Sequence, residues 1–135
     1  VHLLTNGPSA DGSYTGAAYE GVAFLPFVAE KIEFILSPLF GFSAAEDIAV
    51  PITALGAAGA AIGLVPDLVE SGYAAGNDVA VFTAMCMCWS GYLSTHVAMM
   101  DSLKFRNLTG QAILYHTIGG LFAGVSAHFI YMLIT

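Results

Sequence analysis

Long apolar stretches alternate along the chain with short segments that carry its charges. The last stretch, residues 111–134, has 24 residues without a formal charge when His is counted as neutral. At about 1.5 Å of rise per residue, a helix of this length crosses a hydrocarbon layer of roughly 30 Å. Comparable stretches predict helical spans at about 17–36, 44–65, 79–100 and 108–134, after an irregular arm at 1–16. We therefore predict an all-α integral membrane bundle of about four hydrophobic helices, formed by residues 17–135, with some helices broken by Gly or Pro.

Small residues mark the surfaces where these helices are expected to meet. His116 and His128 share one face of the last stretch with two glycines, because all four positions follow at steps of four residues. In a membrane, small residues at such spacing allow another backbone to approach closely. A GxxxG pair gives the 44–65 segment a similar surface. The predicted helix-packing positions are Gly59, Gly63, Gly120 and Gly124.

The first apolar stretch, 17–36, contains charges that a lipid-facing span rarely carries. Glu30 and Glu33 share a stripe, and Pro26 removes a backbone hydrogen bond partway along. We expect a helix that lies in the interface or is kinked at Pro26, with its carboxylates facing water or partner helices. The two carboxylates then form either a solvated face beside Lys31 or a site for cation or proton coupling.

The two middle stretches carry signals for helix starts and for a helix break. Ser43 is a predicted N-cap, with Glu46 at the third helical position as in a capping box. The 79–100 stretch begins with Asn77 or Asp78 as its cap. If this helix opens at residues 90–91, the freed carbonyls and nearby hydroxyls become available to a ligand.

Composition and charge support a membrane protein. Hydrophobic residues make up 57% of the chain, charged residues 10%, and the mean hydropathy is +0.77. Soluble domains contain about 25% charged residues. The net charge of −7 excludes a nucleic-acid footprint. The basic residues at 104 and 106 predict a cytoplasmic loop at 102–106. Because the chain starts at Val1, we expect a processed chain or part of a longer product.

Cysteines and histidines are the candidate ligands. Cys86 and Cys88 point in different directions on a helix, which favours buried thiols over a soft-metal site, and we expect no metal site. His96 could meet His116 across the last helical hairpin, although counting from a turn at 102–106 places them a turn or more out of level. Three roles are open to each of His96, His116 and His128: a structural hydrogen bond, contact with a polar substrate, or binding of a metal or haem.

Four stretches of the chain resemble the Gate domain, also called the nucleoside-recognition domain, of bacterial membrane carriers. They are SPLFGF at 37–42, PITALGAAGAAIGLVPDLVESG at 51–72, WSGYLSTHVAMMDSL at 89–103, and the HTIGGL segment that follows. The resemblance implies one half of a pore, completed by a second half in a homo-oligomer, a partner subunit or a missing part of the chain. The family's polar cluster maps to Tyr92, Ser94 and Thr95. The acidic residue that often follows its Ser is replaced here by Thr95 or His96.

These observations lead to a transport hypothesis and two alternatives. We expect a carrier module for a small polar solute, such as a nucleoside or related metabolite, and not an enzyme. The predicted substrate-binding residues are Thr53, Tyr92, Ser94, Thr95, His96 and His116. No cofactor is expected; the first alternative is an electron-transfer subunit that binds haem b through His96 and His116. The second is a scaffold subunit of a membrane complex.

Overall fold

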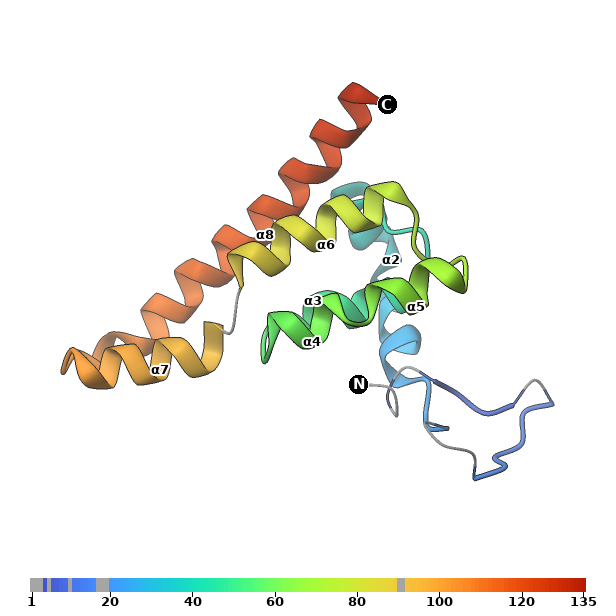
Figure 1. Ribbon diagram of the computed structural model, residues 1–135, viewed down its shortest axis with the longest axis horizontal. Coiled ribbons are helices and arrows are strands. Elements are labelled where there is room, and N and C mark those ends of the chain that lie inside the picture. Colours follow the sequence, from blue (N-terminus) through green and yellow to red (C-terminus); the bar gives the residue numbers. More distant parts are fainter. Residues whose placement is uncertain (1–3, 5, 10, 17–19, 90–91) are drawn as a thin grey trace.

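The protein is described by a computed structural model that covers residues 4, 6–9, 11–16, 20–89 and 92–135. These residues form helices and no strand, which confirms the predicted all-α class (Figure 1). The elements are α2 (Phe24–Phe40), η1 (Ala45–Ile48), α3 (Ala49–Ala54), α4 (Ala58–Ile62), α5 (Val65–Glu70), α6 (Gly76–Cys88), α7 (Tyr92–Ser102), η2 (Arg106–Leu108) and α8 (Thr109–Ile134).

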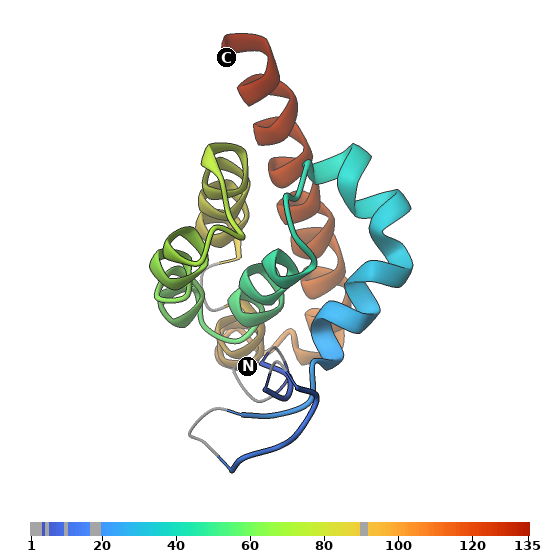
Figure 2. The ribbon, with the colours of Figure 1, turned by 90° about the vertical axis from the view of Figure 1, so that its right-hand side faces the viewer.

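The long helix α8 is the axis of the arrangement. Helix α6 runs antiparallel beside it, and α7 lies against its N-terminal part (Figure 1). Seen from the side, α2 lies on one side of α8, and the short helices α3, α4 and α5 lie on the other, next to α6 (Figure 2). The main buried apolar cluster therefore lies between α6, α8, the end of α2 and the α3–α4 region.

Two glycines on α8 allow α6 to pack closely against it. A Cβ built at Gly120 would lie 1.8 Å from Trp89 Nε1, and one at Gly124 would lie 2.8 Å from Met85 Sδ. Both facing side chains are buried. Any larger residue at either glycine would have to displace the side chains of α6.

The GxxxG pair of the 44–65 segment lies elsewhere. No described atom would lie within 4 Å of a Cβ at Gly59, and a Cβ at Gly63 would meet only carbonyl oxygens of its own turn. Gly59 and Gly63 meet no other described helix because the segment is divided into η1, α3 and α4 and does not run along α8.

Helix α2 begins later than the sequence pattern indicates. It starts at Phe24, so Pro26 occupies the first turn, where the missing N–H breaks no intrahelical hydrogen bond. The helix ends at Gly41, whose φ of +64° closes the last turn with a 2.8 Å hydrogen bond from its N–H to Ser37 O. After this corner the chain turns by 79° into η1 and α3.

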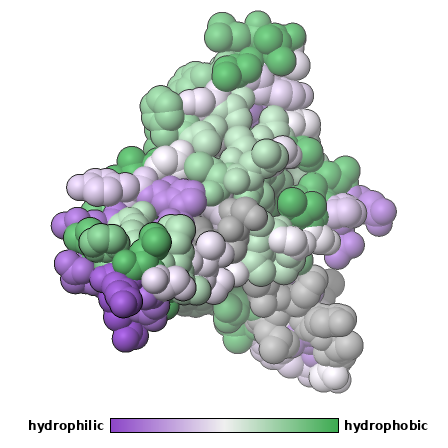
Figure 3. All heavy atoms as spheres, turned by 60° about the vertical axis from the view of Figure 1, so that its left-hand side comes forward, coloured by the Kyte–Doolittle hydropathy of each residue, from purple (hydrophilic) through white to green (hydrophobic). Residues whose placement is uncertain are grey.

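One continuous helical segment of the described chain, Arg106–Ile134, is long and apolar enough to cross a membrane. The segments Phe24–Phe40 and Ala45–Ala54 meet the same criterion only when they are taken together across their bend. Much of the apolar surface is exposed; on α8, for example, Phe122 is 73% and Leu133 85% exposed. Hydrophobic side chains cover much of the face seen in Figure 3, including the C-terminal end of α8 at the top.

Before α2, the described part of the N-terminal arm is organised around two carboxylates. Glu20 accepts a 2.8 Å hydrogen bond from the Thr15 N–H. Asp11 accepts hydrogen bonds from the hydroxyl and the N–H of Ser13, at 2.6 and 3.0 Å. The Ser13 hydroxyl, and secondarily its N–H, lowers the pKa of Asp11 from its ordinary value because both stabilise the charged form.

Candidate functional site

A polar contact inside the bundle lies where α6 ends and α7 begins. Helix α6 ends at Cys88 and α7 begins at Tyr92; the predicted opening at residues 90–91 lies outside the described residues. His116 of α8 lies beside this break, and its Nε2–H donates a hydrogen bond to Cys88 O. A carbonyl at the end of α6 therefore finds its partner on another helix.

His96 of α7 completes this contact. His96 Nε2 lies 2.9 Å from His116 Nδ1, and the two rings meet edge to face with centroids 4.7 Å apart. Because the carbonyl of Cys88 can only accept, His116 Nε2 must carry a proton. In the neutral form of the His116 ring, Nδ1 then accepts from His96 Nε2–H.

The two histidines are level, in contrast to the expectation that they are a turn or more apart. The α7–α8 turn is not residues 102–106 but 103–108, and it includes η2 and the left-handed Lys104, with φ of +62°. His96 therefore lies six residues before the end of α7, and His116 seven residues after the start of α8. These nearly equal distances from the turn bring the rings together.

The other predicted substrate residues take different positions. The Thr53 hydroxyl donates a 2.7 Å hydrogen bond to Ala49 O within its own helix, α3. Ser94 and Thr95 are exposed on α7. Tyr92 begins α7, and its side chain lies outside the described part. Of the six predicted residues, the structure brings His96 and His116 into direct contact.

Trp89 attaches the end of α6 to the same residue of α8. Its indole Nε1–H donates a 3.2 Å hydrogen bond to His116 O, and its ring is buried over Gly120. His116 therefore contacts the α6 terminus through both its side chain and its carbonyl. This double contact, which the sequence did not suggest, fixes one side of the break.

A second polar contact connects α2, α6 and α8. Asn77 Nδ2 donates to the carbonyls of Phe40 and Gly41, at 2.9 Å each, and its Oδ1 accepts a 2.8 Å hydrogen bond from His128 Nδ1. His128 is 9% exposed. A Cβ at Gly41 would lie 2.3 Å from His128 Cε1, so glycine is needed here for space as well as for its positive φ. The structure thus gives His128 a structural hydrogen bond.

Two buried aspartates form a third polar contact, which the sequence analysis missed. The Asp78 carboxylate accepts from the Ser43 N–H and hydroxyl, at 3.1 and 2.7 Å, and from the Ala75 N–H at 2.7 Å. Asp47 Oδ2 accepts a 3.0 Å hydrogen bond from the Ala44 N–H. Ser43 is therefore not the N-cap of η1: Ala44 is, because the Ser43 hydroxyl donates to α6 instead.

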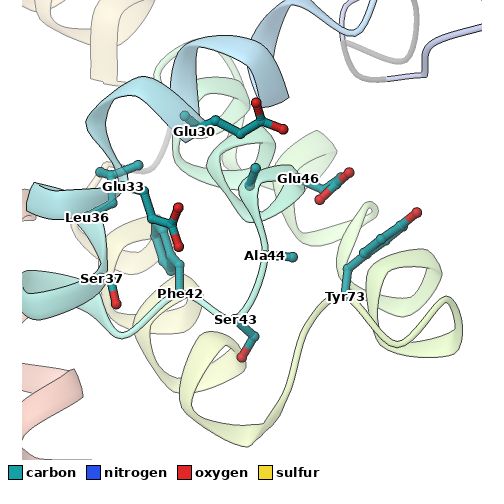
Figure 4. Close-up of a pocket in the computed structure, with 11 residues that line it drawn as sticks. Glu30, Glu33, Leu36, Ser37, Phe42, Ser43, Ala44, Glu46 and Tyr73 are labelled. Carbon is teal, nitrogen blue, oxygen red and sulfur yellow. The ribbon is translucent and has the colours of Figure 1, made fainter.

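An acidic pocket of about 330 Å³ lies outside this pair of aspartates, between α2 and η1 (Figure 4). Glu30 and Glu33 line it from α2, Glu46 from η1, and Tyr73 from the connection between α5 and α6. Glu30 and Glu33 are exposed and thus take up the solvated position that the sequence offered as one alternative.

The described residues include no group of three or more His, Cys, Asp and Glu side chains that could hold a metal ion. Cys86 is buried, Cys88 is half-buried, and both are free thiols. A haem iron between His96 and His116 would need roughly 2 Å on each side, as metal–imidazole bonds do. Since the two facing nitrogens lie 2.9 Å apart, the rings would have to separate to hold an iron.

Comparison with known proteins adds no assignment. The sequence matches no family model, and neither the curated proteins nor the solved structures show significant similarity to it.

Proposed function

We propose that this chain is a membrane transport module, half of a Gate-type carrier that moves a small polar solute such as a nucleoside or a related metabolite. Its support is the resemblance of four stretches to the Gate domain, the high mean hydropathy of +0.77 and the apolar helix α8. The exposed apolar side chains of α8 would face lipid or a second half. The membrane is a bacterial inner membrane, with residues 102–106 on the cytoplasmic side.

The contact of His116 with the broken helix carries this proposal. Non-helical backbone inside a membrane is tolerated where it is buried in protein or lines a cavity, and discontinuous helices form the substrate sites of many carriers. Here the terminal carbonyl of α6 is held by His116, which also contacts His96. The hydroxyls of Ser94 and Thr95 are exposed on α7, in the turn that precedes and includes His96. Imidazoles and hydroxyls together would offer a polar solute several donors and acceptors.

A second half is needed because the polar face of α7 is open on one side. A polar solute recovers the free energy of losing its water only if donors and acceptors surround it. The exposed face of α7 supplies one side alone. A second copy, a partner subunit or a further part of the chain would close the other side.

Uptake by reconstituted protein tests the proposal. We would replace Ser94 and Thr95 with Ala and His96 with Leu, reconstitute each variant in liposomes and measure uptake of labelled nucleosides. Each lost hydrogen bond, worth about 1 kcal/mol, should weaken apparent affinity about fivefold. Thr83→Ala is the matched control, because Thr83 is exposed on α6 and donates to Val79 O of its own helix. Undiminished uptake by all the variants would exclude this cluster as the substrate site.

An electron-transfer subunit remains the alternative because two imidazoles from neighbouring helices meet at His96 and His116. It requires the rings to part and admit iron. The absorption spectrum of protein expressed with ample haem distinguishes the two functions. A Soret band that is lost in His96→Leu would favour haem binding over transport; no band would remove the alternative.

A further inference from the structure

We propose that Asp47 is a proton-binding site: with Asp78 it forms a buried carboxyl pair that holds one proton at neutral pH, on Asp47. This inference does not depend on what the chain transports. Asp47 and Asp78 are each 0% exposed, and they come from η1 and α6, which are distant in sequence. The pair is located beside the corner where the chain turns from α2 into η1.

The two carboxyl groups accept hydrogen bonds from consecutive backbone N–H groups. The Ser43 N–H donates to Asp78, and the next N–H, that of Ala44, donates to Asp47. The charge of Asp78 is close enough to act on Asp47. Two adjacent carboxylates out of contact with water repel each other, and burial penalises each charge further. One proton held by the pair removes the repulsion and the burial penalty of one of the two charges.

The numbers of donors decide which aspartate holds the proton. Asp78 accepts three hydrogen bonds, whereas Asp47 accepts one at 3.0 Å from the Ala44 N–H and has the Ser43 N–H as a weaker second donor. Asp47 Oδ1 is buried and has no hydrogen-bond partner among the described residues. A proton on Asp47 Oδ1 neutralises the buried oxygen that lacks a donor, whereas Asp78 keeps its three donors and its charge.

A metal ion would fit the same position poorly. The donors around Asp78 are N–H and O–H groups, whose positive ends would repel a cation. No third acidic, His or Cys side chain of the described chain joins the pair. One free carboxylate oxygen is too few for Na⁺ or Ca²⁺, which take several oxygen ligands, but it is sufficient for a proton.

The charged surroundings favour proton uptake. The acidic pocket is lined by Ser43 and Ala44, whose N–H groups contact the pair, and by Glu46, which precedes Asp47. The remaining titratable groups on the adjoining elements are Glu30, Lys31 and Glu33 of α2, Tyr73 before α6, and His128 of α8, which contacts Asn77; α3 has none. Most of these groups are acidic, so the local potential would attract protons from water.

Infrared spectroscopy of the full chain tests the assignment. At neutral pH the wild type should show the C=O band of a protonated carboxyl, and the band should shift when aspartate is labelled with ¹³C. Asp47→Asn should remove this band. Asp67→Asn is the control, because Asp67 lies on α5 and is exposed, and it should leave the band unchanged.

A second measurement follows the thermal midpoint of unfolding with pH. If folded Asp47 binds a proton more tightly than the unfolded chain does, wild-type stability falls as pH rises from the pKa of Asp47 in the unfolded chain to its higher pKa in the fold, and levels off above it. The stability of Asp47→Asn should lack this component. Should Asp47→Asn fail to fold, Asp47→Glu should shift the infrared band instead. The proposal is overturned if the wild type lacks the band or if the band survives Asp47→Asn. It is also overturned if Asp47→Glu leaves the band unshifted, or if replacing K⁺ with Na⁺ in the buffer abolishes the band.

Discussion

Gly120 provides a sharp test of how α6 packs on α8. In Gly120→Ala the new Cβ would lie 1.8 Å from Trp89 Nε1 and 2.2 Å from Cε2, so the buried indole has to move. Forcing one extra carbon into a packed core costs about 1–3 kcal/mol. The displaced indole would also lose its hydrogen bond to His116 O, which adds about 1 kcal/mol. We therefore expect the free energy of unfolding to fall by about 2–4 kcal/mol.

The adjacent glycine provides the matched control. Outside the backbone of its own helix and its two chain neighbours, no described atom lies within 4 Å of a Cβ at Gly119. Gly119→Ala should therefore be neutral or should stabilise the helix, by up to about 1 kcal/mol. Unfolding of the two variants in detergent, followed by far-ultraviolet circular dichroism, measures the difference. Combining Gly120→Ala with Trp89→Phe removes the clashing indole, so the double variant should lose less stability than the sum of the two single variants. Equal stability of the two alanine variants, or strict additivity in the cycle, would refute this packing.

Two further predictions concern polar contacts outside the proposed solute site. Asn77→Ala removes three hydrogen bonds, to Phe40, Gly41 and His128, and should lower the free energy of unfolding by about 2–4 kcal/mol. Asn107→Ala, on exposed η2, is the control and should change this free energy little. Similar losses in the two variants would contradict the bridging role of Asn77. Ser13→Ala should raise the pKa of Asp11 towards its ordinary value of 3.8, measured by NMR titration. Because folding lowers this pKa, the Ser13 contact stabilises the arm at pH values above the ordinary pKa of Asp, and this stabilisation is lost as pH falls. A pKa of Asp11 that does not change in Ser13→Ala would contradict the contact.

The all-α class and the long last helix could be predicted from the sequence, because both depend on local composition. The apolar stretch at 108–134 corresponds to α8, whereas the predicted opening at residues 90–91 lies outside the described residues. The contacts between distant segments could not be predicted in the same way. Asn77 looks like a helix cap in sequence, and only the fold shows that its amide reaches the end of α2 and His128.

Helix boundaries also limited the prediction of side-chain contacts. Counting from a turn at 102–106 placed His96 and His116 out of level. The turn begins one residue later and ends two residues later, and this difference brings the two rings together. No contact was predicted for Asp47, because the nearby Ser43 and Glu46 match a capping box. The competing acceptor for Ser43, the Asp78 carboxylate, lies 35 residues away and cannot be recognised from spacing.

The chain contains a single tryptophan, and its indole is hydrogen-bonded to the backbone of His116. Its fluorescence therefore originates beside the imidazole that we expect to meet the solute. Any event that moves His116 or changes its charge should alter the colour or intensity of that emission. The protein thus contains its own optical probe, so that ligands can be screened without attaching a dye.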